Sequence, residues 1–121
     1  EQVVVEGNTS LIGSIFRNLT ENAIAYSGGR NIYISLIENN DQMCKIRFED
    51  DGCGVDDKQL PRLFERFYRV DKGRTRRMGG TGLGLAIVKH AVQFHGGTII
   101  ASNHPNGGLR FEFVLMKHSE L

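Results

Sequence analysis

Two pairs of strand-like segments constrain the fold of this chain more than any other feature. Residues 31–38 and 43–50 are rich in β-branched residues and are separated by the turn-forming run ENND, which predicts a hairpin. Residues 98–102 and 108–116 form a second pair around the turn-rich NHPNGG. Helical patterns at 10–26 and 83–96 precede the two pairs, so helices and strands do not alternate strictly. This order argues against a Rossmann-like parallel sheet and favours a mixed sheet with helices on one face.

The first predicted helix carries two asparagines on one face. Capping residues at 8–10 and an apolar stripe beginning at Leu11 predict a helix from about Ser10 to Tyr26, ended by the glycines that follow. Asn18 and Asn22 are four residues apart, so their side chains share a face. They either point to solvent or bond to a neighbouring loop, or they offer a neutral oxygen ligand to Mg²⁺, which takes only one or two protein oxygens.

The second strand ends in a D-x-G-x-G motif, DDGCG at residues 50–54. Its glycines let the backbone turn sharply or approach a flat ligand closely. The carboxylate of Asp50, at the end of the strand, can accept a hydrogen bond from an exocyclic amine. The alternative interpretation is a tight turn with a capping aspartate.

A glycine-rich segment, GTGLGL at residues 80–85, opens the second predicted helix. The uncapped amides and dipole of a helix start bind anions, and the basic run at 66–77 precedes it, either as a solvated face or as a phosphate-binding loop. The spacing fits neither a dinucleotide fingerprint nor a P-loop. Together, a metal ligand, an amine acceptor and a phosphate cradle describe Mg²⁺-ATP as the ligand.

Length and composition limit the possible domain organisation and partners of the chain. The 121 residues carry a net charge of +1, which suggests one domain and no particular partner. Two cysteines without a ligand pattern argue against a zinc site and a disulfide framework. No apolar run reaches the ~18–20 residues of a membrane span. The abrupt start suggests that residues 1–121 are a fragment of a longer protein, whose membrane topology stays open.

Four motifs in order resemble the catalytic and ATP-binding domain of sensor histidine kinases, in the GHKL superfamily of gyrase, heat-shock chaperone, histidine kinase and mismatch-repair ATPase. NLTENAIAYS (18–27) resembles the N box, DDGCG (50–54) the first glycine box, LFERFYRVD (63–71) the F box and GGTGLGLAIV (79–88) the second glycine box. The resemblance implies an α+β fold, a two-layer sandwich with a mixed sheet of about five strands on three helices and a mobile ATP lid.

Carried over residue by residue, the resemblance implies that Asn22 holds Mg²⁺ and that Asn18 supports the phosphates or a water. It implies that Asp50 accepts from the adenine amine and that Tyr26 lies against the adenine ring. It also implies that Phe64 and Phe67 anchor the lid; the alternative is that both are plain core aromatics. The remaining implied nucleotide-binding residues allow close packing of the adenine, contact phosphate from the lid or offer backbone amides: Gly52, Gly54, Arg69, Gly80, Thr81, Gly82, Leu83 and Gly84.

Two departures from the family pattern bear on the reaction. Ala25 stands where many sensor kinases carry a lysine that reaches phosphate. Asn18 stands where the superfamily's ATPases carry a water-activating glutamate, and an amide cannot take a proton. Glu21 is adjacent to Asn22 and points about 100° away around the helix. The chain is therefore expected to hold ATP without hydrolysing it quickly, which favours a kinase.

The expected function is donation of the γ-phosphate of Mg-ATP to a histidine on an upstream dimerisation domain. None of the four histidines lies in an acceptor motif, so no catalytic base is named in this chain; His90 and His95 are expected to be core or cap residues. A response regulator is the implied partner, with a cytoplasmic, monomeric domain in a homodimeric parent. The alternatives are an ATP-hydrolysing GHKL domain and a non-catalytic binding module. A nucleic-acid binder is disfavoured because stacking aromatics are not interleaved with the basic residues.

Overall fold

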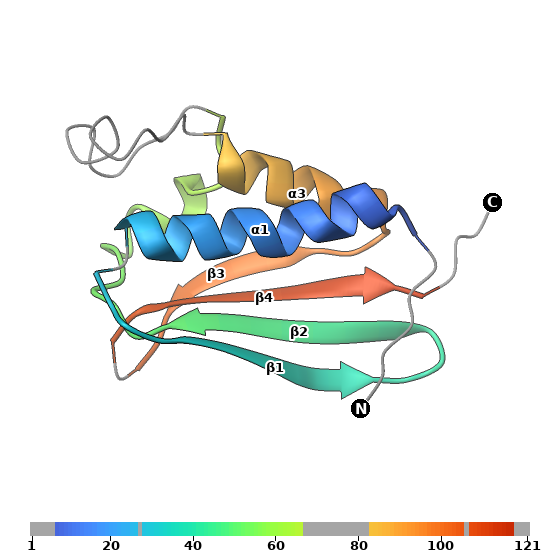
Figure 1. Ribbon diagram of the computed structural model, residues 1–121, viewed down its shortest axis with the longest axis horizontal. Helices are drawn as coiled ribbons and strands as arrows, with labels where there is room; N and C mark the ends of the chain where they lie inside the picture. Colours follow the sequence, from blue (N-terminus) through green and yellow to red (C-terminus); the bar gives the residue numbers. More distant parts are fainter. Residues whose placement is uncertain (1–6, 27, 67–82, 106, 118–121) are drawn as a thin grey trace.

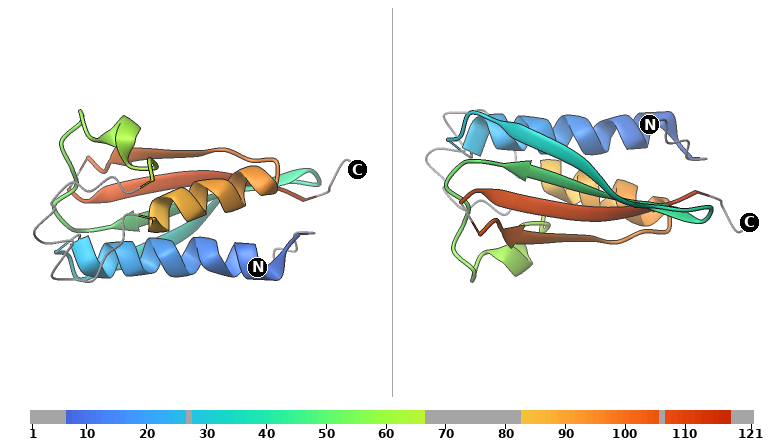
Figure 2. Two further views of the ribbon diagram at one scale, coloured as in Figure 1. Left: turned by 90° about the horizontal axis from the view of Figure 1, so that it is seen from above. Right: turned by 90° about the horizontal axis from the view of Figure 1, so that it is seen from below.

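The computed structural model describes residues 7–26, 28–66, 83–105 and 107–117. The four strands form one antiparallel sheet in the order β1-β2-β4-β3, and both α-helices lie on the same face of it (Figures 1 and 2). This two-layer α+β arrangement confirms the predicted fold class. The elements in chain order are α1 (Thr9–Tyr26), β1 (Ile32–Asn39), β2 (Met43–Asp50), the 3₁₀ turn η1 (Leu60–Arg62), α3 (Gly84–Phe94), β3 (Ile99–Asn103) and β4 (Leu109–Met116).

The described part of the chain differs from the expected element count. It holds four antiparallel strands and two α-helices, where about five strands in a mixed sheet and three helices were expected. The strands are antiparallel because each sequential pair is a hairpin and because β2 and β4 also run in opposite directions. The segment from Lys58 was expected to hold a short helix at most, and the described part of it contains the single turn η1, with Pro61 in its first turn.

The helix α1 begins where the capping residues predict. The Asn8 side chain accepts a hydrogen bond from the Leu11 amide at 3.0 Å, which satisfies one of the amides left unpaired at a helix start. Ile15, Leu19 and Ala23 are buried at four-residue intervals and form the apolar stripe that faces the sheet. The 18-residue length follows from this stripe and ends before Gly28, whose φ is 72°.

The core lies between the helices and the sheet. In β4, Leu109, Phe111, Phe113 and Leu115 alternate with less buried residues, as expected for a strand with one covered face. Their side chains meet the stripe of α1 and the buried Val88, Ala91 and Val92 of α3. Among the helices that the structure describes, none combines the length and apolarity needed to span a bilayer.

A buried histidine fixes the end of α3 against the start of α1. His95 Nδ1 lies 2.7 Å from the Ala91 carbonyl oxygen, and its Nε2 accepts the Asn8 amide at 3.0 Å. The proton is therefore on Nδ1, where it is donated to Ala91. The interpretation of His95 as a core or cap histidine is confirmed, whereas His90 is exposed on α3.

Candidate functional site

Three of the sequence motifs meet at one end of the sandwich. The end of α1, the end of β2, the start of α3 and the β3–β4 turn converge there (Figure 1). The helices run antiparallel (Figures 1 and 2), and the middle of α1, at Asn18, lies beside the start of α3, at Gly84. This arrangement places the predicted metal ligand, amine acceptor and phosphate cradle on neighbouring elements.

Asn18 joins α1 to the start of α3. Its Nδ2 donates to the Ser14 carbonyl oxygen at 2.8 Å, which leaves Oδ1 on the opposite side of the amide. A methyl group added to Gly84 would lie 3.2 Å from this oxygen, so Gly84 lets the two helices approach closely at this point. Asn18 therefore lies at a helix contact and not in open solvent, beside the first turn of α3.

Asn22 lies one helical turn beyond Asn18, nearer the end of α1, and is half-buried. Because α1 and α3 are antiparallel and Asn18 lies beside Gly84, this turn of α1 extends past the first residue of α3. The role of Asn22 as a ligand of Mg²⁺ stays a prediction. Leu83 is the N-cap of α3, with no side-chain cap hydrogen bond, as expected for a helix start that offers amides to an anion.

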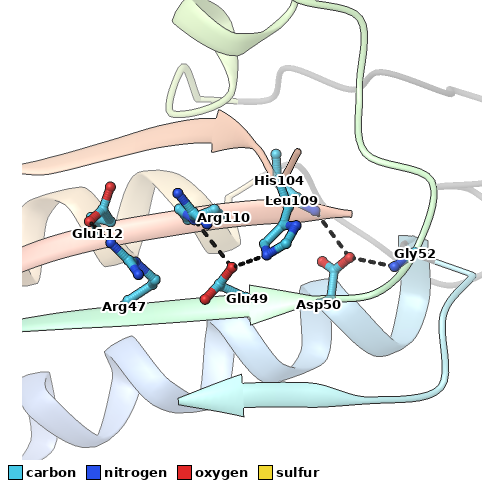
Figure 3. A network of polar contacts seen from close by, with 8 residues as sticks. All are labelled: Arg47, Glu49, Asp50, Gly52, His104, Leu109, Arg110 and Glu112. Atoms are coloured by element: carbon cyan, nitrogen blue, oxygen red, sulfur yellow. Dashed lines mark hydrogen bonds and ion pairs between the residues drawn. The ribbon is translucent and has the colours of Figure 1, made fainter. Parts of the chain in front are cut away.

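Asp50 is a buried carboxylate held in one orientation. It is 5% exposed, and its Oδ1 accepts the Gly52 amide at 2.9 Å and the Leu109 amide at 3.2 Å (Figure 3). Gly108 lies directly against the Asp50 carbonyl, where any Cβ would overlap that oxygen. Among the described residues both hydrogen bonds go to Oδ1, so Oδ2 is the oxygen that remains to accept from a ligand amine.

The first glycine box is braced by the end of β3. Asn103 accepts the Val55 amide at 3.0 Å and donates to the Val55 carbonyl at 2.7 Å and to Asp57 Oδ1 at 2.9 Å. Gly54 has φ of +68°, and a side chain there would collide with the Asn103 amide. Gly54 is thus required by both conformation and space, independently of any ligand.

Asp51 ties the loop after α1 to the first glycine box. Its Oδ1 accepts the amides of Arg30 at 2.7 Å and Asn31 at 2.9 Å, and its Oδ2 accepts Asn31 Nδ2 at 2.8 Å. These hydrogen bonds, led by the two from Asn31, hold the pKa of Asp51 below its ordinary value of 3.8. Asp51 therefore connects the loop after α1 to the D-x-G-x-G loop, a role that no motif in the sequence indicated.

The lowered pKa of Asp51 predicts acid-dependent stability. The carboxylate contributes stability above its unfolded-state pKa, and this contribution is lost as pH falls through the lower folded-state pKa. The difference in unfolding free energy between the wild type and Asp51→Asn should be constant above about pH 5 and shrink below it. Urea unfolding between pH 2 and pH 7 measures this. A difference that stays constant to the lowest pH would contradict the assignment.

The described donors agree with a metal held mainly by its nucleotide. No group of three or more His, Cys, Asp or Glu side chains that could hold a metal ion occurs within the described ranges. An amide oxygen from Asn22 suits Mg²⁺, which completes its octahedron with phosphate oxygens and waters. The donor chemistry of Asn22 therefore fits a Mg²⁺ ion that is bound mainly through the phosphates of ATP.

Several predicted site residues lie outside the described residues. Tyr26 is the last residue of α1, but its side chain is not among those described. Phe64, in contrast, is described, and it packs edge-on against Phe111 at a centroid distance of 6.0 Å, as a core aromatic does. The expected lid, residues 70–79, and the following site residues also lie outside: Phe67, Arg69, Gly80, Thr81 and Gly82.

Comparison with known proteins identifies the fold and motifs as those of one family. The family model described as histidine kinase-, DNA gyrase B-, and HSP90-like ATPase matches residues 7–119. The sensor histidine kinase WalK of Bacillus subtilis is 41% identical over 92% of this chain, and the signal transduction histidine-protein kinase BaeS of Escherichia coli is 41% identical over all of it. The chain spans only 18% and 26% of those two proteins.

Solved structures agree with the sequence relatives. A mycobacterial sensor histidine kinase, MprB, superposes with a TM-score of 0.78 at 30% identity, covering 93% of this chain and 76% of that one. The ATP-binding domain of PrrB from Mycobacterium tuberculosis gives 0.74 at 28% identity, covering 95% of this chain and 73% of that one. The resemblance carried by the four motifs is confirmed, and the chain belongs to the histidine kinase-, DNA gyrase B- and HSP90-like ATPases as a histidine kinase catalytic, ATP-binding domain.

Proposed function

We propose that this domain binds Mg²⁺-ATP and donates the γ-phosphate to a histidine on a separate helical domain of a two-component sensor kinase. The observation that carries the proposal is Asp50, a buried carboxylate with one oxygen fixed by two amides. A fixed acceptor of this kind suits an adenine amine. The relatives are named a sensor histidine kinase and a signal transduction histidine-protein kinase, and these names support a phosphoacceptor histidine and a response regulator as partners.

The chain's own residues supply binding and orientation. Asn22 would hold Mg²⁺, which neutralises charge on the phosphates when bound. The start of α3, at Leu83 and Gly84, would present amides to phosphate oxygens. Holding the donor in line with an acceptor accounts for much of the catalysis of phosphoryl transfer. The general base would come from the acceptor domain.

ATP hydrolysis is the second candidate function, and the geometry of Asn18 disfavours it. Asn18 occupies the position of the ATPases' glutamate, and its Nδ2 is engaged with the Ser14 carbonyl oxygen. Neither end of an amide takes up a proton from water at neutral pH. Slow phosphate release is therefore expected from the isolated domain, which we place in the cytoplasm as a monomer within a homodimeric parent.

The proposal predicts transfer only in the presence of an acceptor domain. The isolated domain, incubated with γ-labelled ATP and Mg²⁺, should bind nucleotide and remain unlabelled. Adding the parent's dimeric phosphoacceptor domain should place acid-labile label on that domain, and a variant of that domain lacking its histidine should stay unlabelled. Acid-labile label on the isolated domain, or rapid phosphate release without an acceptor, would contradict the proposal.

A further inference from the structure

A second set of polar contacts lies next to Asp50, on the face of the sheet opposite the helices (Figure 3). Glu49 precedes Asp50 in β2, so its side chain points to the face opposite the helices. Its Oε2 accepts Arg110 Nε at 3.2 Å and lies 2.9 Å from His104 Nε2. Glu49 is only 9% exposed, and a carboxylate this buried requires such partners.

The partners of Glu49 belong to the same backbone that holds Asp50. Arg110 is directly opposite Glu49 in the β2–β4 ladder, and the residue before it, Leu109, donates its amide to Asp50 Oδ1. His104 starts the turn between β3 and β4, because its amide donates to the Gly108 carbonyl at 2.9 Å. Gly108 in turn lies against the Asp50 backbone. Glu49 therefore links β2 to β4 through Arg110 and to the β3–β4 turn through His104. Both of these segments also contact Asp50.

We propose that Glu49 and His104 are positioning residues that fix the Asp50 carboxylate and thereby set the preference for adenine over guanine nucleotides. This inference rests on the proposed function, in which Asp50 Oδ2 accepts the adenine amine. Guanine carries a carbonyl oxygen at the corresponding ring position, and two acceptors facing each other repel. The repulsion acts only if the carboxylate is held in place, because a loosened side chain or turn swings away.

The same face of the sheet offers a matched control. Arg47 and Glu112 are also directly opposite each other in β2 and β4, with Arg47 Nη2 3.1 Å from Glu112 Oε2. This pair is two residues further from Asp50 along each strand. Breaking it removes a comparable ion pair without touching the β3–β4 turn. A purely structural effect of the outer-face ion pairs should therefore appear equally in both places.

The test is the ratio of dissociation constants for GTP and ATP, measured by calorimetry with Mg²⁺. We expect His104→Ala to lower this ratio about tenfold, within the range for coupled neighbouring groups. His104→Gln should keep the ratio within about twofold of the wild type, because its side-chain amide can donate in place of Nε2. Arg47→Met, with its stability measured alongside, should leave the ratio unchanged.

Two results would overturn the inference. One is a wild type that discriminates between ATP and GTP, together with a His104→Ala variant whose ratio of the two dissociation constants equals that of the wild type. The other is a ratio that falls as far in Arg47→Met as it does in His104→Ala. If His104→Ala does not fold, Glu49→Gln is measured instead, and an unchanged ratio there has the same meaning. A wild type that binds neither nucleotide would refute the proposed function itself, and the wild-type titration alone reveals it.

Discussion

Replacing Asn22 by alanine is expected to lower the rate of phosphoryl transfer by about a hundredfold or more. The side chain lies one turn beyond Asn18, whose oxygen meets the start of α3, and it is the predicted protein ligand of Mg²⁺. Losing that oxygen leaves the metal without its protein anchor and lets the phosphates move out of line. The measurement is the initial transfer rate to the phosphoacceptor domain at saturating ATP, repeated over a range of Mg²⁺ concentrations.

Glu21→Gln is the matched control for Asn22. Glu21 is the adjacent, exposed residue and points about 100° away around the helix. Its replacement should leave the transfer rate within about twofold, because exposed surface substitutions rarely disturb a site. An Asn22→Ala variant that transfers at the wild-type rate, with unchanged Mg²⁺ dependence, would remove Asn22 from the site.

Replacing Asp50 by asparagine is expected to weaken ATP binding about ten- to a hundredfold, which corresponds to about 1.5–3 kcal/mol for a hydrogen bond to a charged group. The change keeps an acceptor for the amides of Gly52 and Leu109, which now bind Oδ1. It replaces Oδ2 by an NH₂ group, which cannot accept from the adenine amine. Calorimetric titration with ATP and Mg²⁺ gives the affinity directly.

Asp41→Asn provides the control for the loss of charge. Asp41 is exposed in the β1–β2 turn, at the other end of the sheet from Asp50 (Figure 1). The same change of net charge there should leave ATP affinity within about twofold, because exposed charges further apart than a Debye length are largely screened at 0.15 M salt. Equal affinities of the wild type and Asp50→Asn would show that the nucleotide base is not held by this carboxylate.

Local periodicity was sufficient to predict the elements of the fold. The stripe that includes Ile15 and Leu19 is set by the helical period, and the Asn8 cap by backbone amides a few residues away. The strand ends followed from turn residues. The positions of Asn18 and Asn22 on one face, and of Asp50 at a strand end, needed only these short-range rules. The two helices and four strands in the described residues lie within one residue of the expected bounds, except at the end of α3.

The partners of the site residues could not be predicted, because they depend on the strand order. Asp50 is held by Leu109, which is 59 residues away in sequence, and Val55 is held by Asn103 at a separation of 48. These contacts arise because β4 lies between β2 and β3 in the sheet. The position of Asp50 at a strand end could be predicted from the sequence, but no local pattern showed that the adjacent Asp51 accepts hydrogen bonds from Arg30 and Asn31 in the loop after α1. This role of Asp51 appears only in the folded chain.

The most direct test of the central claim is a crystal structure of the domain with Mg²⁺ and a non-hydrolysable ATP analogue. We expect the adenine amine to lie within hydrogen-bonding distance of Asp50 Oδ2, the metal to be bound by Asn22, and phosphate oxygens to accept amides at the start of α3. An analogue bound elsewhere, or no analogue between α1 and α3 at saturating concentration, would contradict the account.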